Sequence, residues 1–215
     1  MNCRRIVKGS AAQRFPVAFC VRAAGMMLCA VIGTSSVYAA GSEHIRWDLI
    51  HVNFSTTPVT ISRGGISIAS ADVTTNQITF TDSSGTFLAP ESGRISHDVT
   101  GGGNWTTSDG MTTKSGKYTV TAVVSWQFAN FQTNPAIDLI DPHPKANGNA
   151  ILLIQYDDGD QGVLGVGCHG PGAPPGIQEG VIATKGYVTY WLGAAHGPGV
   201  DINFTSFHVL DADER

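Results

Sequence analysis

The stretch Ile151-Leu152-Leu153-Ile154-Gln155-Tyr156-Asp157-Asp158-Gly159-Asp160-Gln161-Gly162-Val163-Leu164 decides the fold class of this chain. Two largely apolar runs flank Asp158-Gly159, a dipeptide that suits the two-residue type I′ turn of a β-hairpin. Closing the turn there pairs Ile154 with Val163. The stretch therefore predicts two antiparallel strands joined by a tight turn.

Segments of the same kind recur on both sides of this hairpin. They are rich in Val, Ile, Thr, Tyr, Phe and Trp, are separated by Gly, Ser, Asn and Asp, and show no sustained helical period. The expected strands are 45–49, 59–63, 66–69, 77–81, 85–88, 103–107, 117–128, 150–156, 162–168, 186–191 and 201–210. The pattern predicts an all-β domain, either an antiparallel β-sandwich or a closed β-barrel of about nine to eleven strands.

Four local features refine this prediction. Gly64-Gly65 predicts a two-residue turn that pairs the strands before and after it. Alternating apolar and charged residues over 45–49 indicate a strand with one face in water. Residues 176–184 leave room for a short helical turn. Residues 130–149 carry three prolines and little periodicity, which predicts a long loop and the edge of a functional site.

The first forty residues have the pattern of an export signal. Five basic residues precede or enter a weakly apolar core, and Ala39-Ala40 ends the segment with small residues. We expect residues 1–40 to be cleaved and residues 41–215 to form one secreted or periplasmic domain with the general look of small bacterial β proteins. Arg4-Arg5 leaves twin-arginine export open beside the general secretory route, and Cys29 leaves lipidation open.

Removal of the signal changes the charge and cysteine content. Residues 41–215 hold eight basic and seventeen acidic residues, a net charge of −9, which argues against nucleic acid as a partner. Cys168 is the only cysteine outside the signal, so an internal disulfide is excluded. No stretch approaches the ~20 apolar residues of a membrane-spanning helix.

Two repeated loops supply candidate catalytic residues. His169-Gly170-Pro171-Gly172 recurs as His196-Gly197-Pro198-Gly199. A hydrolase or isomerase would use His169 or His196 as acid and base, with Asp201 or Asp141 to orient the imidazole. A zinc site from the two histidines and Asp201 is a further alternative, although closely spaced histidine pairs are absent from the sequence. Turn-forming residues alone also explain the repeat.

The acidic turn of the central hairpin supplies a candidate metal site. The type I′ register places Asp157 opposite Asp160, and facing carboxylates repel unless a hard cation such as calcium lies between them. The alternative is that these carboxylates are hydrated. The twelve-residue calcium-loop pattern is absent.

Aromatic side chains supply a candidate ligand surface. Trp105, Tyr190 and Trp191 could stack on the flat faces of sugar rings, or they could fill the core. Two hypotheses follow from the sequence. The first is an exported binding or cell-surface interaction module for a small molecule, glycan or protein. The second is a small hydrolase or isomerase with its site near the two His-Gly-Pro-Gly loops.

Overall fold

The computed structural model describes residues 43–71, 75–133, 136–193 and 199–210. Within these ranges the chain forms strands, turns and loops and no helix, so no helix there is long and apolar enough to cross a membrane. The strands are β1 (His44–Asn53), β2 (Thr60–Arg63), β3 (Ile66–Ser70), β4 (Gln77–Leu88), β5 (Gly102–Ser108), β6 (Thr113–Phe131), β7 (Ile137–Asp138), β8 (Lys145–Tyr156), β9 (Gln161–Cys168), β10 (Gly180–Lys185), β11 (Val188–Tyr190), β12 (Leu192–Gly193) and β13 (Thr205–Leu210). The expected export signal lies outside the described residues.

Six antiparallel strands close into a barrel. Around the ring, β1 pairs with β4, β4 with β5, β5 with β6, β6 with β8, β8 with β13, and β13 with β1. Strand β13 closes the ring, because Phe207 pairs with Ala146 on one side and with Trp47 on the other. The sequence prediction of an all-β sandwich or barrel is confirmed, with the barrel as the outcome.

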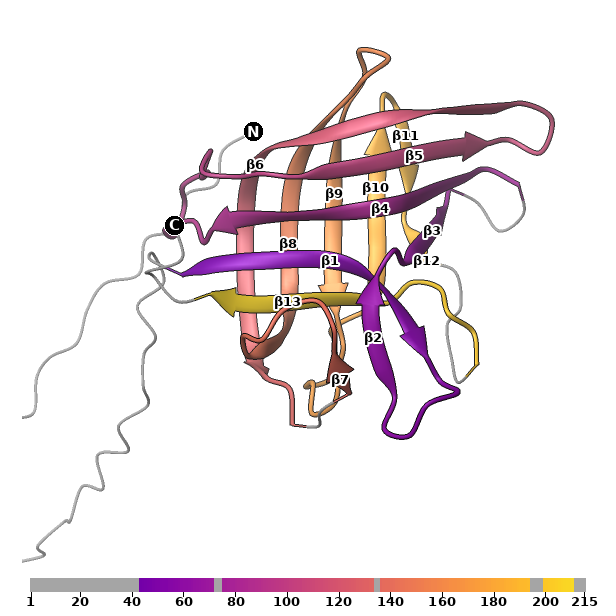
Figure 1. Ribbon diagram of the computed structural model, residues 1–215. Helices are drawn as coiled ribbons and strands as arrows, with labels where there is room; N and C mark the ends of the chain where they lie inside the picture. Colours follow the sequence, from indigo (N-terminus) through magenta and orange to yellow (C-terminus); the bar gives the residue numbers. More distant parts are fainter. Residues whose placement is uncertain (1–42, 72–74, 134–135, 194–198, 211–215) are drawn as a thin grey trace, which may run out of the picture. The chain divides into compact units, whose positions relative to one another are not determined.

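The remaining strands extend the sheet outside the ring. Strands β9, β10 and β11 continue it beyond β8. Strand β2 pairs with the second half of β1 and β7 pairs with β2, while β3 pairs with β4 and β12 pairs with β3. Only β2 and β7 pair in parallel among the described strands. Figure 1 shows β6, β8, β9 and β10 side by side, crossing the direction of β1, β4, β5 and β13. The two groups therefore form crossed walls.

Large side chains fill the space between these walls. Trp47, Phe80, Phe87, Tyr156 and Phe207 are all at most 1% exposed. Phe207 from the closing strand lies 4.6 Å, between ring centroids, from Trp126 of β6. Buried aromatic area of this kind is the main source of stability in a core without disulfides.

The predicted hairpin at Gly64-Gly65 was wrong. Strand β2 pairs with β1, whereas β3 pairs with β4, so the two strands that flank the glycines do not pair with each other. Gly64 has a φ of 95°, and a Cβ on Gly65 would overlap the backbone of Ile50. The glycines therefore let the chain cross close over β1 and change its partner strand.

Three further predictions need correction. Strand β10 occupies the second half of the expected helical turn at 176–184. The expected loop 130–149 is shorter, because β6 runs to Phe131 and β8 begins at Lys145. The central hairpin forms, but Ile154 pairs with Gly162, not Val163. Its loop has three residues, with Gly159 at a φ of 96°, which shifts the register by one residue.

Candidate functional site

Strand β1 buries side chains on both of its faces. Trp47 and Leu49 face the barrel interior, and the alternation then changes phase, so that Ile50 and Val52 are buried on the opposite face. The expected wet face at 45–49 was wrong, since Asp48 is 0% exposed. Other chain segments therefore cover the outer face of β1.

A cavity of about 530 Å³ lies against the apolar half of this outer face. Its apolar wall combines β1, β2 and the residue before β13, and Ile50, Val52 and Ile61 form a buried cluster separate from the barrel core. Its residues are Ile50, Val52, Phe54, Thr56, Thr57, Pro58, Val59, Ile61, Gln132, Ala136, Lys145, Cys168, His169, Gly170, Pro171, Glu179, Phe204, Thr205 and Ser206. We call this space the β1 pocket.

Polar groups gather at one end of the β1 pocket. Ser206 of β13 is 1% exposed, and no described residue hydrogen-bonds its Oγ. Lys145 of β8 pairs in register with His208, two residues along β13 from Ser206, so the Lys145 and Ser206 side chains are diagonal neighbours on one face. Both residues line the β1 pocket.

Glu179 closes another side of the pocket. Its Oε1 accepts from the Thr205 backbone N at 2.6 Å, and its Oε2 accepts from the His169 backbone N. Burial raises the pKa of Glu179 to about 7, against the opposing effect of these two amides. The carboxyl group therefore joins the end of β9 to the start of β13 and titrates near neutrality.

Cys168 lies beside Glu179 and is 1% exposed. Its Sγ is 3.3 Å from both Gln132 Nε2 and the Thr205 carbonyl oxygen. Burial raises the pKa of its thiol, which keeps the sulfur protonated and unreactive. Cys168 therefore behaves as a small, buried residue of the pocket wall.

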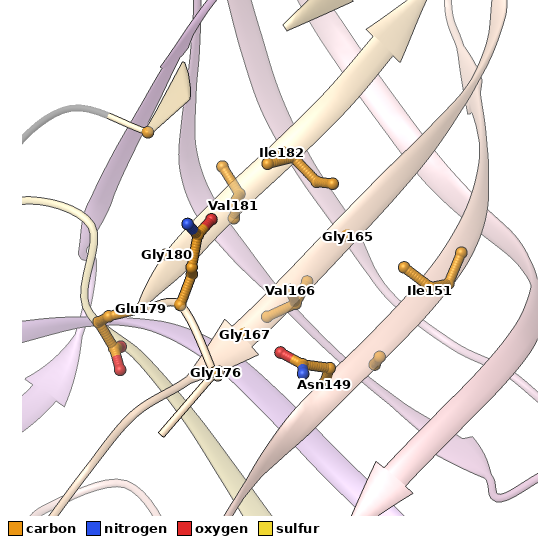
Figure 2. A pocket seen from close by; sticks show the side chains of 13 residues that line it. Asn149, Ile151, Gly165, Val166, Gly167, Gly176, Glu179, Gly180, Val181 and Ile182 are labelled. Carbon is orange, nitrogen blue, oxygen red and sulfur yellow. The ribbon is translucent and has the colours of Figure 1, made fainter. Parts of the chain in front are cut away.

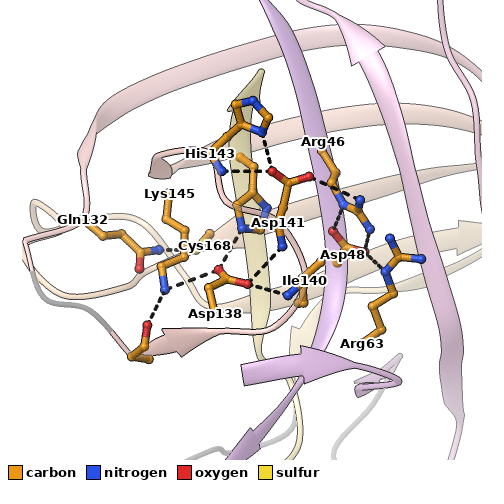
Figure 3. Close-up of polar contacts among 12 residues, drawn as sticks. Arg46, Asp48, Arg63, Gln132, Asp138, Ile140, Asp141, His143, Lys145 and Cys168 are labelled. Atoms are coloured by element: carbon orange, nitrogen blue, oxygen red, sulfur yellow. Dashed lines mark hydrogen bonds and ion pairs between the residues drawn. The ribbon is translucent and has the colours of Figure 1, made fainter. Parts of the chain in front are cut away.

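Lys145 belongs to a network of largely buried, charged side chains (Figure 3). Asp138 Oδ2 lies 2.8 Å from His208 Nε2 and 3.4 Å from Lys145 Nζ, and Asp138 Oδ1 accepts from the Ile140 backbone N at 2.8 Å. Burial opposes ionisation, but these partners lower the pKa of Asp138 to about 2. Asp138 therefore stays ionised and holds the ammonium of Lys145 in place.

The network continues along the outer face of β1. Asp141 Oδ1 lies 2.5 Å from His143 Nδ1, and Asp141 Oδ2 lies 3.4 Å from Arg46 Nη1. Arg46 in turn donates to both oxygens of Asp48, at 2.7 and 2.9 Å. A recess of about 410 Å³ lies over Asp141 and His143 and shares Gln132, Ala136 and Lys145 with the β1 pocket. Ion pairs of Asp138 and Asp141 thus connect the segment between β6 and β8 to strands of the barrel.

The predicted catalytic residues are only partly brought together. His169 lies at the β1 pocket, but its Nδ1 contacts the Ile177 carbonyl oxygen at 2.7 Å. Asp201 contacts His51 Nδ1 and accepts from the Val52 backbone N at 2.6 Å. Asp141 pairs with His143 and Arg46. His196 lies outside the described residues, so the proposed combination with His196 stays a prediction.

The three candidate aromatic residues have different environments. Trp105 and Tyr190 are buried, at 2% and 4% exposed, and both belong to the barrel core. Trp191 is 60% exposed, and its Nε1 donates to the Ala71 carbonyl oxygen at 3.3 Å. Trp105 and Trp191 therefore do not form one surface on which a sugar ring could stack. Glycan binding at Trp191 alone stays a prediction.

Two aspartates of the turn between β8 and β9 form ion pairs with Lys185. Asp157 Oδ2 accepts from the Lys117 backbone N at 2.7 Å, while Lys185 Nζ binds Asp158 and lies 2.5 Å from Asp160 Oδ2. The shifted register removes the predicted facing of Asp157 and Asp160. Among the described residues, no group of three or more His, Cys, Asp or Glu side chains is arranged to hold a metal ion. Calcium binding at Asp157 and Asp160 stays a prediction, but the strand register that suggested it, with the two residues facing each other, was wrong.

A second depression, of about 310 Å³, lies on the outer face of β8, β9 and β10 (Figure 2). Gly165 forms part of its floor between Ile151 and Ile182, and a Cβ on Gly165 would lie 2.6 Å from Ile182 Cγ1. The Ile182 side chain thus already covers part of this floor. The β1 pocket is larger and has several polar groups at one end, so it is the better candidate site.

Sequence reasoning missed most of the β1 pocket. One usable signal was the phase change at Leu49-Ile50, after which apolar residues occupy the even-numbered positions of the strand. Glu179, Lys145 and Ser206 had no recognisable motif, because the fold brings them together from three different segments. Residues of the first His-Gly-Pro-Gly loop and of the 130–149 loop both line the pocket, and a functional site at these loops stays a prediction.

Comparisons of this chain with protein-family models, curated proteins and solved structures find no match. Functional inference therefore depends on the cavity and on the side chains that surround it.

Proposed function

We propose that this chain is an exported binding module that holds a small, largely apolar molecule in the β1 pocket. The observation that carries the proposal is a cavity of about 530 Å³ between buried apolar side chains, with polar groups at one end. Ligand pockets are commonly about 300–1,000 Å³ and mostly apolar, with a few polar groups that orient the ligand.

The position of the pocket supports this proposal. Ile50 and Val52 lie on β1, which is hydrogen-bonded to β13 or β2 along its length. Ser206 and Lys145 also lie on strands of the barrel ring. Side chains on paired strands keep their positions better than side chains on loops, so this part of the pocket wall keeps its shape before a ligand enters.

Titration with the uncharged fluorescent dye Nile red tests the proposal. We expect dye emission to rise and to saturate at one dye per chain, because the dye moves from water to an apolar wall. Val59→Trp places an indole into the pocket and should abolish this saturable binding. Val124→Trp is the matched control, since Val124 is an exposed residue of β6 outside the pocket.

The control variant should bind the dye as the unmodified protein does. Equal dye binding by Val59→Trp and the unmodified protein would locate the dye elsewhere and contradict the proposal. Absence of any saturable emission from the unmodified protein would contradict it as well.

One observation favours a second candidate function, that of a small isomerase. Glu179 has a pKa raised to about 7 and lines the pocket, and such a carboxylate suits proton transfer at neutral pH. The test is exchange of the methyl protons of acetophenone in deuterium oxide, followed by NMR. Exchange that is accelerated by the protein and lost in Glu179→Gln would support the isomerase, and exchange at the buffer rate would contradict it.

A further inference from the structure

We infer that the polar end of the β1 pocket selects an uncharged ligand oxygen, such as that of a ketone, ester or alcohol, and discriminates against carboxylates. This inference rests on the proposed function and specifies the class of ligand. It depends on the hydrogen-bonding state of Ser206, on the geometry of Lys145 and on the pairing of the charges around them.

Ser206 lacks the partner that a buried hydroxyl needs. Ser206 is one of the residues that line the pocket, and its buried Oγ has no hydrogen bond to any described residue. Leaving a buried hydroxyl unpaired destabilises the folded state, and such groups are rare in folded proteins. An oxygen atom of a ligand in the pocket would satisfy this hydroxyl.

Lys145 offers a second donor to the same ligand oxygen. Its ammonium has three N–H groups, and its two acceptors among the described residues are the Ala136 carbonyl oxygen at 3.2 Å and Asp138 Oδ2 at 3.4 Å. The third N–H has no acceptor among the described residues, and Lys145 lines the pocket. Figure 3 shows Lys145 next to Gln132 and Cys168, which also line the pocket.

The charges around this end are already balanced. Asp138 pairs with Lys145, and Arg46 pairs with Asp48, the cross-strand neighbour of Ser206. Glu179 adds a negative charge to the pocket wall when it ionises. A ligand carboxylate would lose its hydration without gaining an unpaired cation, whereas a neutral oxygen needs only the two donors.

Three small probes of similar size separate these cases: ethylbenzene, acetophenone and benzoate. Each is titrated into the protein at about pH 8, where Glu179 and benzoate are ionised, and binding is followed by amide NMR shifts of pocket residues. We expect acetophenone to bind about five- to tenfold more tightly than ethylbenzene, as one or two hydrogen bonds allow. Benzoate should bind more weakly than acetophenone by at least that factor.

Ser206→Ala tests the role of the hydroxyl, with the exposed Ser115→Ala as control. In Ser206→Ala the preference for acetophenone over ethylbenzene should fall to about twofold or less, with ethylbenzene affinity unchanged. Thermal stability should stay equal or rise, because the substitution removes an unpaired buried hydroxyl. Ser115→Ala should keep the full preference.

The failures of the two proposals are distinguishable. Benzoate binding as tight as that of acetophenone, or a preference that survives Ser206→Ala, would overturn the inference and leave apolar binding intact. A loss of thermal stability in Ser206→Ala would show a structural partner for the hydroxyl and also overturn it. If none of the probes shifts pocket amides, the proposed function fails and this inference fails with it.

Discussion

Glu179 gives the sharpest prediction, a specific dependence of folding stability on pH. Its pKa rises from 4.5 to about 7 on folding because burial penalises the carboxylate. The folded state therefore holds this proton more tightly than the unfolded state does. The stability that this group contributes is fully present below about pH 4.5 and is lost as pH rises through about 7.

The magnitude follows from the shift. A difference of one pKa unit corresponds to about 1.4 kcal/mol, so the shift of Glu179 corresponds to about 3 kcal/mol between about pH 4 and about pH 8. Asp138 does not interfere, because its pKa is lowered to about 2 and its contribution is lost only under more acidic conditions.

Urea denaturation of the unmodified protein and of Glu179→Gln measures this effect. The Gln side chain cannot ionise, so it loses one hydrogen bond at every pH but has no titration of its own. We expect the stability difference between the two proteins to change by about 3 kcal/mol from about pH 4 to about pH 8, in favour of the variant at high pH. Parallel pH profiles for the two proteins would refute this reasoning about burial.

Three other predictions concern the supports of the fold. Asp138→Ala should lower the free energy of unfolding, measured by urea denaturation, by about 3–5 kcal/mol, because it removes the carboxylate that pairs with the largely buried Lys145 and His208. The exposed control Glu91→Ala should lower it by less than about 1 kcal/mol. Equal losses in the two variants would contradict the proposed role of the charge network. Gly65→Ala should lower stability by about 3 kcal/mol or more because a Cβ there overlaps β1, and a stability like that of Gly193→Ala, where the nearest atom is 3.9 Å away, would count against the crossing. Lys185→Met should cost about 2–4 kcal/mol, since the ammonium lies between two carboxylates and 4.4 Å from the centroid of a buried tryptophan; an unchanged melting temperature would show that this ion pair is unimportant.

The all-β class could be predicted because it is a local property of the sequence. Alternating apolar residues and turn-forming glycines mark strands and their ends wherever they occur. The partner of each strand is not local. At Gly64-Gly65 the local pattern favours a hairpin, but close approach to Ile50 directs the strands to different neighbours.

The candidate site was less predictable for the same reason. Asp138 and His208 are 70 residues apart and meet only because β13 closes the barrel. Likewise, Glu179 reaches Thr205 only because the β9–β10 connection lies beside the start of β13. Neither pair has a spacing that chemistry alone would single out. The apolar outer half of β1, by contrast, was visible in the sequence as two adjacent apolar residues, Leu49 and Ile50.

A crystal structure of the protein soaked with acetophenone tests the central claim most directly. We predict density for the ring between Val52 and Phe204, with the carbonyl oxygen within hydrogen-bonding distance of Ser206 Oγ or Lys145 Nζ. Density over Gly165 on the β9 face, or an empty β1 pocket at saturating ligand, would contradict the claim that this cavity is the binding site.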